Sequence, residues 1–139
     1  MLFMKHDILN IKKPSTGSLG EDLAVKYLKS KGFSIIERNF RMKLGEIDII
    51  CAKLGTTHFV EVKTVSRETS QLKSHNNDEY RPEDKMNKAK ILRQKRVIEV
   101  YLNNKGNFEK NNFQIDLISI ILDKSKKTAN ISILSDLIL

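Results

Sequence analysis

The sequence predicts an α/β fold in one layered domain, and three observations lead to this prediction. Its 139 residues are enough for one domain with a single hydrophobic core. Apolar residues recur at helical spacing in two stretches, while β-branched and aromatic residues gather in short runs around them. The resulting order is one helix, three strands, one helix and two strands, which is typical of helices packed on a sheet.

The first half of the domain is expected to hold one helix and three strands. Apolar residues at helical spacing predict a helix over residues 17–30 that ends at Gly32. The runs that follow predict strands over 33–40, 46–52 and 57–64. A short turn around Gly55 makes the last two strands a hairpin.

The second half is expected to begin with a long polar loop over residues 65–84. A basic helix is predicted over 83–102, followed by a turn region over 103–112. Two further strands are expected at 113–122 and 130–134. Residues 1–16 predict a flexible basic segment, which leaves residues 17–139 as the single domain.

The composition excludes several classes of protein. The longest apolar runs are far shorter than the roughly 20 residues of a membrane span, and no signal peptide is evident at the N-terminus. The single cysteine, Cys51, allows no intramolecular disulfide, so a cytoplasmic protein is expected. The net charge of +8 suits a polyanionic partner. Lysine exceeds arginine and Ile and Asn are frequent, so codon usage is an alternative explanation of the charge.

Acidic residues within two apolar strands raise the main question about function. Side chains alternate between faces along a strand, so Glu46 and Asp48 share one face, and Glu61 shares a face with Lys63. If the strands pair as a hairpin, Asp48 and Glu61 can lie close together. Two adjacent carboxylates repel unless one is protonated or a cation lies between them, and oxygen ligands suit Mg²⁺. A solvated hairpin face would explain the same charges, so the spacing alone leaves both interpretations open.

Glu21 lies beside the apolar stripe of the first predicted helix. Its neighbours three, four and seven positions later are Ala24, Val25 and Leu28. This position would direct the carboxylate toward the edge of the core, where it could join the acids of the two strands in one site. An acid in the first turn of a helix is also favoured by the helix dipole, so a purely structural role is open as well.

The second predicted helix carries a cluster of cations. Lys90 and Arg93 fall on its apolar stripe rather than opposite it. They can extend past the edge of the core into solvent, or they can reach the rim of a site and hold a phosphate. The other cations, Lys88 among them, form a solvated face that could follow a nucleic-acid backbone. Because no aromatic residues interleave with these cations, recognition of shape or backbone is expected rather than base readout.

Histidine, cysteine and aspartate side chains can take part in catalysis or metal binding, but those outside the expected site are predicted to be structural or incidental. His6, His58 and His75 lack the spacing of metal ligands and are predicted to be incidental. Cys51 ends an apolar strand and is predicted to be a small core residue. Asp116, in the apolar run FQIDLISI, is predicted to make a structural hydrogen bond.

The segment GSLGEDLAVKYLKSKGFSIIERNFRMKLGEIDIICAKLGTTHFVEVKT resembles a known family. Its specific features are G-E-x-x-A-x-x-Y-L, followed by G-E-I-D and F-V-E-V-K, and the likeness continues to about residue 120. These motifs resemble the YraN-like family of uncharacterised bacterial proteins. That family is similar to archaeal Holliday-junction resolvases and to the restriction-endonuclease-like superfamily.

The resemblance implies a restriction-endonuclease-like three-layer fold, in which helices flank a central mixed β-sheet. It also implies a site for Mg²⁺ or Mn²⁺ whose ligands are Asp48, Glu61 and the main-chain carbonyl of Val62. Lys63 would be the catalytic lysine of this site. Glu21 matches the glutamate on the first helix of resolvases, and the resemblance therefore adds it to the expected catalytic residues.

Two further residues match the YraN-like family itself. Lys90 matches a lysine typical of the family's helix, which favours a place at the rim of the site for it. Glu46 belongs to the G-E-I-D motif, but the superfamily implies no role for it. It could be an outer residue of the site, an extra ligand or simply exposed.

The expected function is metal-dependent hydrolysis of DNA phosphodiester bonds, at branched or junction structures. The alternative is a nucleic-acid-binding module that keeps the fold with little or no catalysis, and a third option is a protein–protein adaptor. DNA is the expected partner, without membrane association. The resemblance also implies a homodimer, because resolvases of this type work as symmetric dimers that make the two cuts of a four-way junction. Either the segment IIERNF or the terminal strand could supply the dimer surface.

Overall fold

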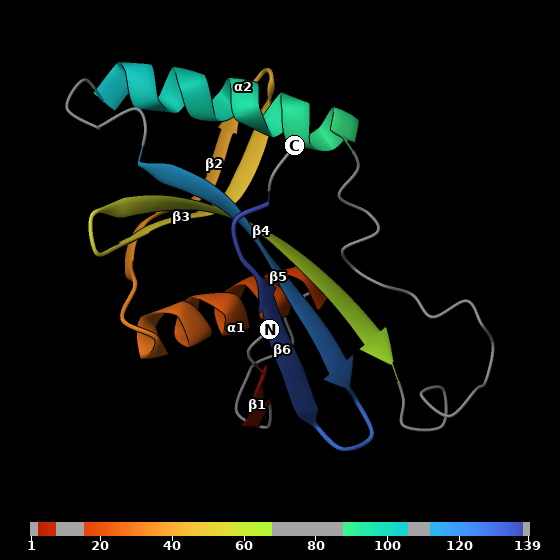
Figure 1. Cartoon of the computed structure of the whole chain (residues 1–139). Helices are drawn as coiled ribbons and strands as arrows, with labels where there is room; N and C mark the ends of the chain where they lie inside the picture. Colours follow the sequence, from red (N-terminus) through yellow and green to blue (C-terminus); the bar gives the residue numbers. More distant parts are fainter. Residues whose placement is uncertain (1–2, 8–15, 68–87, 106–111, 138–139) are drawn as a thin grey trace.

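Six strands form one mixed sheet in a computed structural model of the chain, which describes residues 3–7, 16–67, 88–105 and 112–137 (Figure 1). The order across the sheet is β1-β6-β5-β4-β3-β2, and only β4 and β5 run parallel. The strands are β1 (Phe3–Asp7), β2 (Ser34–Met42), β3 (Gly45–Lys53), β4 (Thr56–Arg67), β5 (Phe113–Asp123) and β6 (Thr128–Leu134).

The two helices, α1 (Thr16–Ser30) and α2 (Lys88–Lys105), cover opposite faces of the sheet (Figure 1). Helix α2 lies in the crossover between the parallel strands β4 and β5. Helix α1 ends at Ser30, as predicted, and it is followed two residues later by Gly32, whose φ of 90° is easily adopted only by glycine. This confirms the α/β prediction and is consistent with a restriction-endonuclease-like three-layer arrangement.

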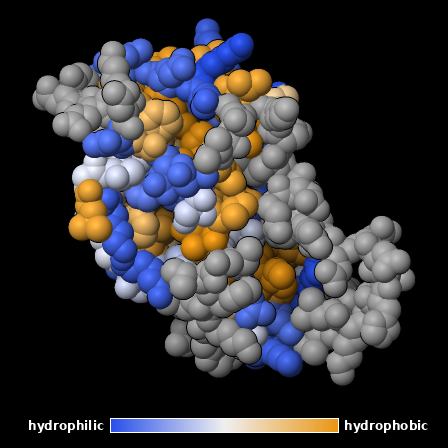
Figure 2. Space-filling view, viewed as in Figure 1, coloured by the Kyte–Doolittle hydropathy of each residue, from blue (hydrophilic) through white to orange (hydrophobic). Residues whose placement is uncertain are grey.

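Each helix packs on its own hydrophobic core. Under α1, Leu23, Tyr27 and Leu28 are buried against β3, β4, β5 and β6. Under α2, Tyr101 packs edge-on against Phe59, with ring centroids 5.7 Å apart, among the other apolar residues of that face. Figure 2 shows hydrophilic residues along the top of the molecule, where Figure 1 places the outer side of α2. No helix in the described parts of the chain is long and apolar enough to cross a membrane.

The β2–β3 hairpin is irregular next to the predicted site. Asn39 has a left-handed φ of 53°, and it falls opposite Asp48 because the flanking pairs are Arg38 with Ile49 and Phe40 with Ile47. The sequence predicted a strand over 33–40, whereas β2 continues to Met42. Asparagine tolerates the left-handed conformation, so the strand twists at Asn39 without ending.

Strict alternation fails in β3 at the same place. The alternation that was expected to place Glu46 and Asp48 on one face would place Ile47 and Ile49 together on the other, but Ile47 joins the core under α2 and Ile49 the core under α1. The β3–β4 pairing ends at Ile49 with Val60. The strands therefore separate beyond this pair, and the separation leaves room for the side chain of Asp48.

The N-terminal residues are a second difference from the prediction. Residues 1–16 were expected to be flexible, but β1 pairs antiparallel with β6, from Phe3 with Ser132 to Asp7 with Thr128. The pairing covers backbone groups of β6 that would otherwise form an open sheet edge. The sequence could not indicate this, because the partner lies at the other end of the chain. Residues 1–2 and 8–15 lie outside the described residues.

The remaining boundaries differ by a few residues. Strand β4 reaches Arg67, beyond the predicted end at residue 64, because β5 supplies parallel partners as far as Asp123. Most of the predicted loop 65–84, the first turn of the predicted helix 83–102 and residues 106–111 lie outside the described residues. Of the two expected dimer surfaces, IIERNF lies in β2 at an edge of the sheet, whereas β6 is covered by β1.

Candidate functional site

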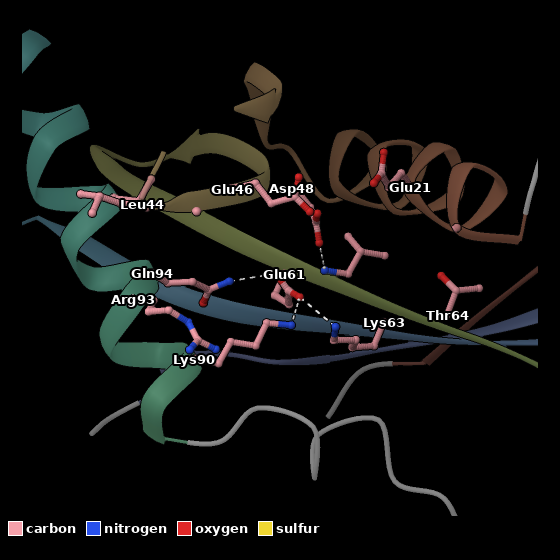
Figure 3. A pocket seen from close by; sticks show the side chains of 14 residues that line it. Glu21, Leu44, Glu46, Asp48, Glu61, Lys63, Thr64, Lys90, Arg93 and Gln94 are labelled. Atoms are coloured by element: carbon pink, nitrogen blue, oxygen red, sulfur yellow. Dashed lines mark hydrogen bonds and ion pairs between the residues drawn. The ribbon is translucent and has the colours of Figure 1, made fainter. Parts of the chain in front are cut away.

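A pocket of about 480 Å³ opens where β3 and β4 separate, and residues of α1, β3, β4 and α2 line it (Figure 3). Except for Lys88, all the predicted site residues contribute to its lining: Glu21, Asp48, Glu61, Val62, Lys63, Lys90 and Arg93. The backbone of Lys88 begins α2, but its side chain lies outside the described part of the chain. The fold therefore brings together residues from four elements that are distant in sequence.

The side chain of Asp48 accepts a hydrogen bond that backbone pairing between β3 and β4 no longer supplies. Its Oδ2 accepts a hydrogen bond of 2.8 Å from the main-chain N–H of Val62. This N–H lies beyond the last paired residues of the hairpin, so a side-chain oxygen replaces a backbone acceptor. The bond fixes the carboxylate of Asp48 beside β4, next to Glu61.

Glu61 is buried on the α2 face of β4, and three donors hold its carboxylate. Gln94 Nε2 donates to Oε2 at 2.8 Å, while Lys90 Nζ and Lys63 Nζ lie 2.6 and 3.1 Å from Oε1 (Figure 3). Residues Phe59, Glu61 and Lys63 share this face by alternation, as predicted. Gln94 was missed, because a lone glutamine in a basic helix gives no signal except its place four residues after Lys90.

The pocket strongly perturbs the ionisation of Asp48. Burial, followed by the charge of Glu61, raises the pKa of Asp48 to about 7 against an ordinary value of 3.8, although the Val62 hydrogen bond opposes the rise. The charge of Glu21 adds a smaller increase. The charges of two glutamates therefore act on Asp48 in this pocket, and a positive charge beside these carboxylates would be favourable.

Lys63 keeps its positive charge at neutral pH. Burial lowers the pKa of Lys63, but its net pKa is raised above the ordinary value, and the physical causes of this rise are the hydrogen bond to Glu61 and the charges of Glu61 and Asp48. A lysine in this state is a stable point charge rather than a proton acceptor. It can therefore stabilise negative charge that develops close to Glu61.

The two other glutamates at the pocket have arginine partners from β2. Glu21 extends from α1 and lies 4.0 Å from Arg38, while Glu46 forms an exposed ion pair of 3.2 Å with Arg41. Glu46 thus belongs to the lining of the pocket (Figure 3), and its carboxylate pairs with Arg41. Of the three roles left open for Glu46, the structure favours an exposed residue at the start of the strand.

The cations of α2 divide into two kinds. The side chain of Lys90 is 27% exposed and reaches inward to Glu61, whereas Arg93 is exposed on the pocket rim (Figure 3). Lys90 therefore reaches the rim of the site, as one of the two interpretations predicted. Its described partner there is a carboxylate, so phosphate binding by Lys90 and Arg93 stays a prediction.

The donor set of the pocket fits a hard divalent cation. Asp48 and Glu61 supply carboxylate oxygens, and the main-chain carbonyl of Val62 belongs to the same strand as Glu61. Burial, followed by repulsion from Glu61, raises the pKa of Asp48, and a bound cation would relieve this repulsion. In the described parts of the chain, no three His, Cys, Asp or Glu side chains are grouped so as to hold a metal. Water would have to complete the coordination, as it commonly does for Mg²⁺.

A second polar group lies in the core under α1, away from the pocket. Asp116 is buried and its Oδ2 lies 2.6 Å from Nδ1 of His58, while Oδ1 accepts hydrogen bonds from Gln114 Nε2 and the main-chain N–H of Asp136. The structure thus supports the structural hydrogen bond expected of Asp116. His58 is not incidental, because it is half of this buried pair. Cys51 is buried in the core, as predicted.

Comparisons with known proteins place the chain among relatives of similar length. A UPF0102 protein of Campylobacter fetus is 39% identical over 124 residues, which are 89% of this chain and 99% of that protein. One of Dictyoglomus thermophilum is 39% identical over 112 residues, covering 80% and 86% of the two chains. One of Campylobacter hominis is 34% identical over 125 residues, covering 90% and 100%. The profile of "Uncharacterised protein family UPF0102" matches residues 20–120, which include every predicted site residue, and the chain therefore belongs to the UPF0102, or YraN-like, family.

Proposed function

We propose that this protein hydrolyses DNA phosphodiester bonds with the help of a divalent cation, preferentially at branched or junction structures. One observation carries the proposal. The carboxylates of Asp48 and Glu61 lie together in an open pocket, and the Lys63 ammonium group is 3.1 Å from Glu61. Carboxylates, a charged lysine and cations at the rim are the groups that phosphodiester hydrolysis needs.

In the proposed mechanism, Asp48, Glu61 and the Val62 carbonyl would hold Mg²⁺ or Mn²⁺. When bound, such an ion supplies Lewis-acid chemistry that polarises the phosphoryl group and acidifies a neighbouring water. Lys63 would stabilise negative charge on the phosphate, because its pKa is raised and it stays protonated at neutral pH. Arg93 would position the DNA backbone at the pocket rim.

The test is cleavage of labelled four-way junction and linear duplex DNA in Mg²⁺, in Mn²⁺ and in EDTA. Wild type should cut only with a cation, and Lys63→Ala should lose about 100-fold or more in rate, as expected for removal of one charge-stabilising group. Lys95→Ala is the matched control, because it removes one cation from α2 without removing a residue of the pocket lining. Equal, negligible turnover by wild type and Lys63→Ala in every cation would reject the proposal that the protein is a nuclease.

The second candidate is a nucleic-acid-binding module without turnover, and the contacts of Glu61 favour it. Both oxygens of Glu61 already have donors from Lys63, Lys90 and Gln94, so the carboxylate is satisfied without a metal. Fluorescence anisotropy with junction DNA in EDTA, over a range of KCl, tests this candidate. Salt-dependent binding combined with no turnover in Mn²⁺ would support it. Absence of binding at low salt would exclude both candidates.

A further inference from the structure

Glu61 has a cationic partner from another element of the fold. The Nζ of Lys90, on α2, lies 2.6 Å from Oε1, closer than the Nζ of Lys63 at 3.1 Å. Glu61 itself is only 6% exposed, so its charge needs a partner inside the protein. Lys90 therefore neutralises, in the absence of a metal, one of the two carboxylates expected to bind it.

A divalent cation at Asp48 and Glu61 would meet this ammonium group directly. Both positive charges would use the same carboxylate, and they would repel each other at short distance. Lys90 can move away, because its long flexible side chain is already 27% exposed. Gln94 has no charge to repel the ion and donates to the other oxygen, Oε2, so it can keep Glu61 in place throughout.

We propose that Lys90 is a built-in competitor of the divalent cation, whose ammonium group occupies Glu61 in the cation-free protein and leaves when an ion binds. Lys90 would then set the cation affinity of the site, and Gln94 would be a positioning residue for Glu61. The displaced ammonium group would stand near Arg93, three residues along α2, where both can contact backbone phosphates. The inference rests on the cation site of the proposed function but does not require cleavage.

The direct test is Mn²⁺ binding, measured by calorimetry at neutral pH and fixed KCl without DNA. Lys90→Gln should bind Mn²⁺ about fivefold more tightly than wild type, the change that corresponds to a partly exposed ion pair. Lys90→Arg keeps the charge and should bind like wild type. Arg93→Gln is the matched control, because it removes the same charge from the pocket rim without a described contact to Glu61, and its affinity should change less than that of Lys90→Gln.

A second measurement separates competition from a merely structural role. Without a cation, Lys90→Gln should have a lower melting temperature than wild type, because Glu61 loses its nearest charged partner. Saturating Mn²⁺ should remove this difference, since the ion then neutralises Glu61 in both proteins. If Lys90→Gln is unfolded without metal, circular dichroism should show that Mn²⁺ restores its fold, and failure of that rescue would overturn the inference.

The outcomes distinguish this inference from the proposed function. Equal or weaker Mn²⁺ binding by Lys90→Gln would overturn the competition, even if wild type cleaves DNA. Tighter binding without any cleavage would support the competition and reject the nuclease. No binding by either protein up to about 10 mM Mn²⁺, beyond the range of weak oxygen-ligand sites, would overturn both.

Discussion

Asp48 is expected to make the protein less stable as the pH rises. Burial and the charge of Glu61 raise the pKa of Asp48 from its ordinary 3.8 to about 7. Between these two values the folded protein retains a proton that the unfolded chain has released. Stability therefore falls as pH rises from about 4 to about 7 and stays low above that, because the unfolded state binds fewer protons than the folded state.

The size of the effect follows from the same two pKa values. Their difference, at about 1.4 kcal/mol for each pH unit, corresponds to about 4 kcal/mol of unfolding free energy. Asp48→Asn removes the ionisation, while the amide oxygen can still accept the N–H of Val62, which lies 2.8 Å from Asp48 in the wild type. The variant should be more stable than wild type by up to about 4 kcal/mol at pH 8 and nearly equal to it at pH 4.

Urea unfolding in EDTA at several pH values between about 4 and 8 measures both predictions. The matched control is Glu46→Gln, which removes an exposed carboxylate from the same strand and should show no comparable pH-dependent gain. A difference between Asp48→Asn and wild type that stays constant with pH, or that shrinks as pH rises, would refute the reasoning. Added Mn²⁺ should stabilise wild type more than Asp48→Asn, because the variant lacks the carboxylate charge.

Three further predictions concern the rest of the fold. Gly20→Ala should lower the free energy of unfolding in urea by about 1–3 kcal/mol, because the added Cβ would lie 1.8 Å from Thr64 Oγ1. Gly17→Ala, whose added Cβ would have no atom within 4 Å, should cause no loss, and equal losses in the two variants would contradict this explanation. Asp116→Ala should cost about 3 kcal/mol, since it leaves buried donors unpaired, and a loss below about 1 kcal/mol would argue against the buried pair. Burial, and then the charge of Asp116, raise the pKa of Cys51 to about 12, so thiol reagents at pH 8 should label Cys51 only in urea, and rapid labelling of the native protein would disprove its burial.

The faces on which several residues of the pocket lie could be predicted because they depend on local periodicity. Alternation along β4 placed Glu61 and Lys63 on one face, and the helical stripe of α2 placed Lys90 at the edge of the core. The acid in β3 came from the same reasoning, although the strand does not alternate strictly there. Asp48 reaches the site because the strands separate beside it, and no spacing in the sequence indicates that separation.

The parts that could not be predicted depend on contacts between distant segments. Gln94 meets Glu61 only because the crossover places one turn of α2 over β4, and a sequence pattern does not fix that alignment. Likewise, His58 lacked any motif, because its partner Asp116 comes from a strand paired in parallel more than fifty residues later. Local propensity identifies the elements, whereas their docking decides which polar side chains become partners.

The pairing of β1 with β6 has a consequence for how the protein is made. Strand β1 leaves the ribosome well before its partner, Thr128–Leu134, which follows it by about 120 residues of chain. All the residues between the two strands must therefore be synthesised before β1 can be placed, and such long-range pairing slows folding. Until β1 docks, the newly made β6 has an open edge that a second nascent chain could pair with. A variant shortened by its first seven residues should keep the pocket, but it should aggregate during expression at concentrations that the complete chain tolerates.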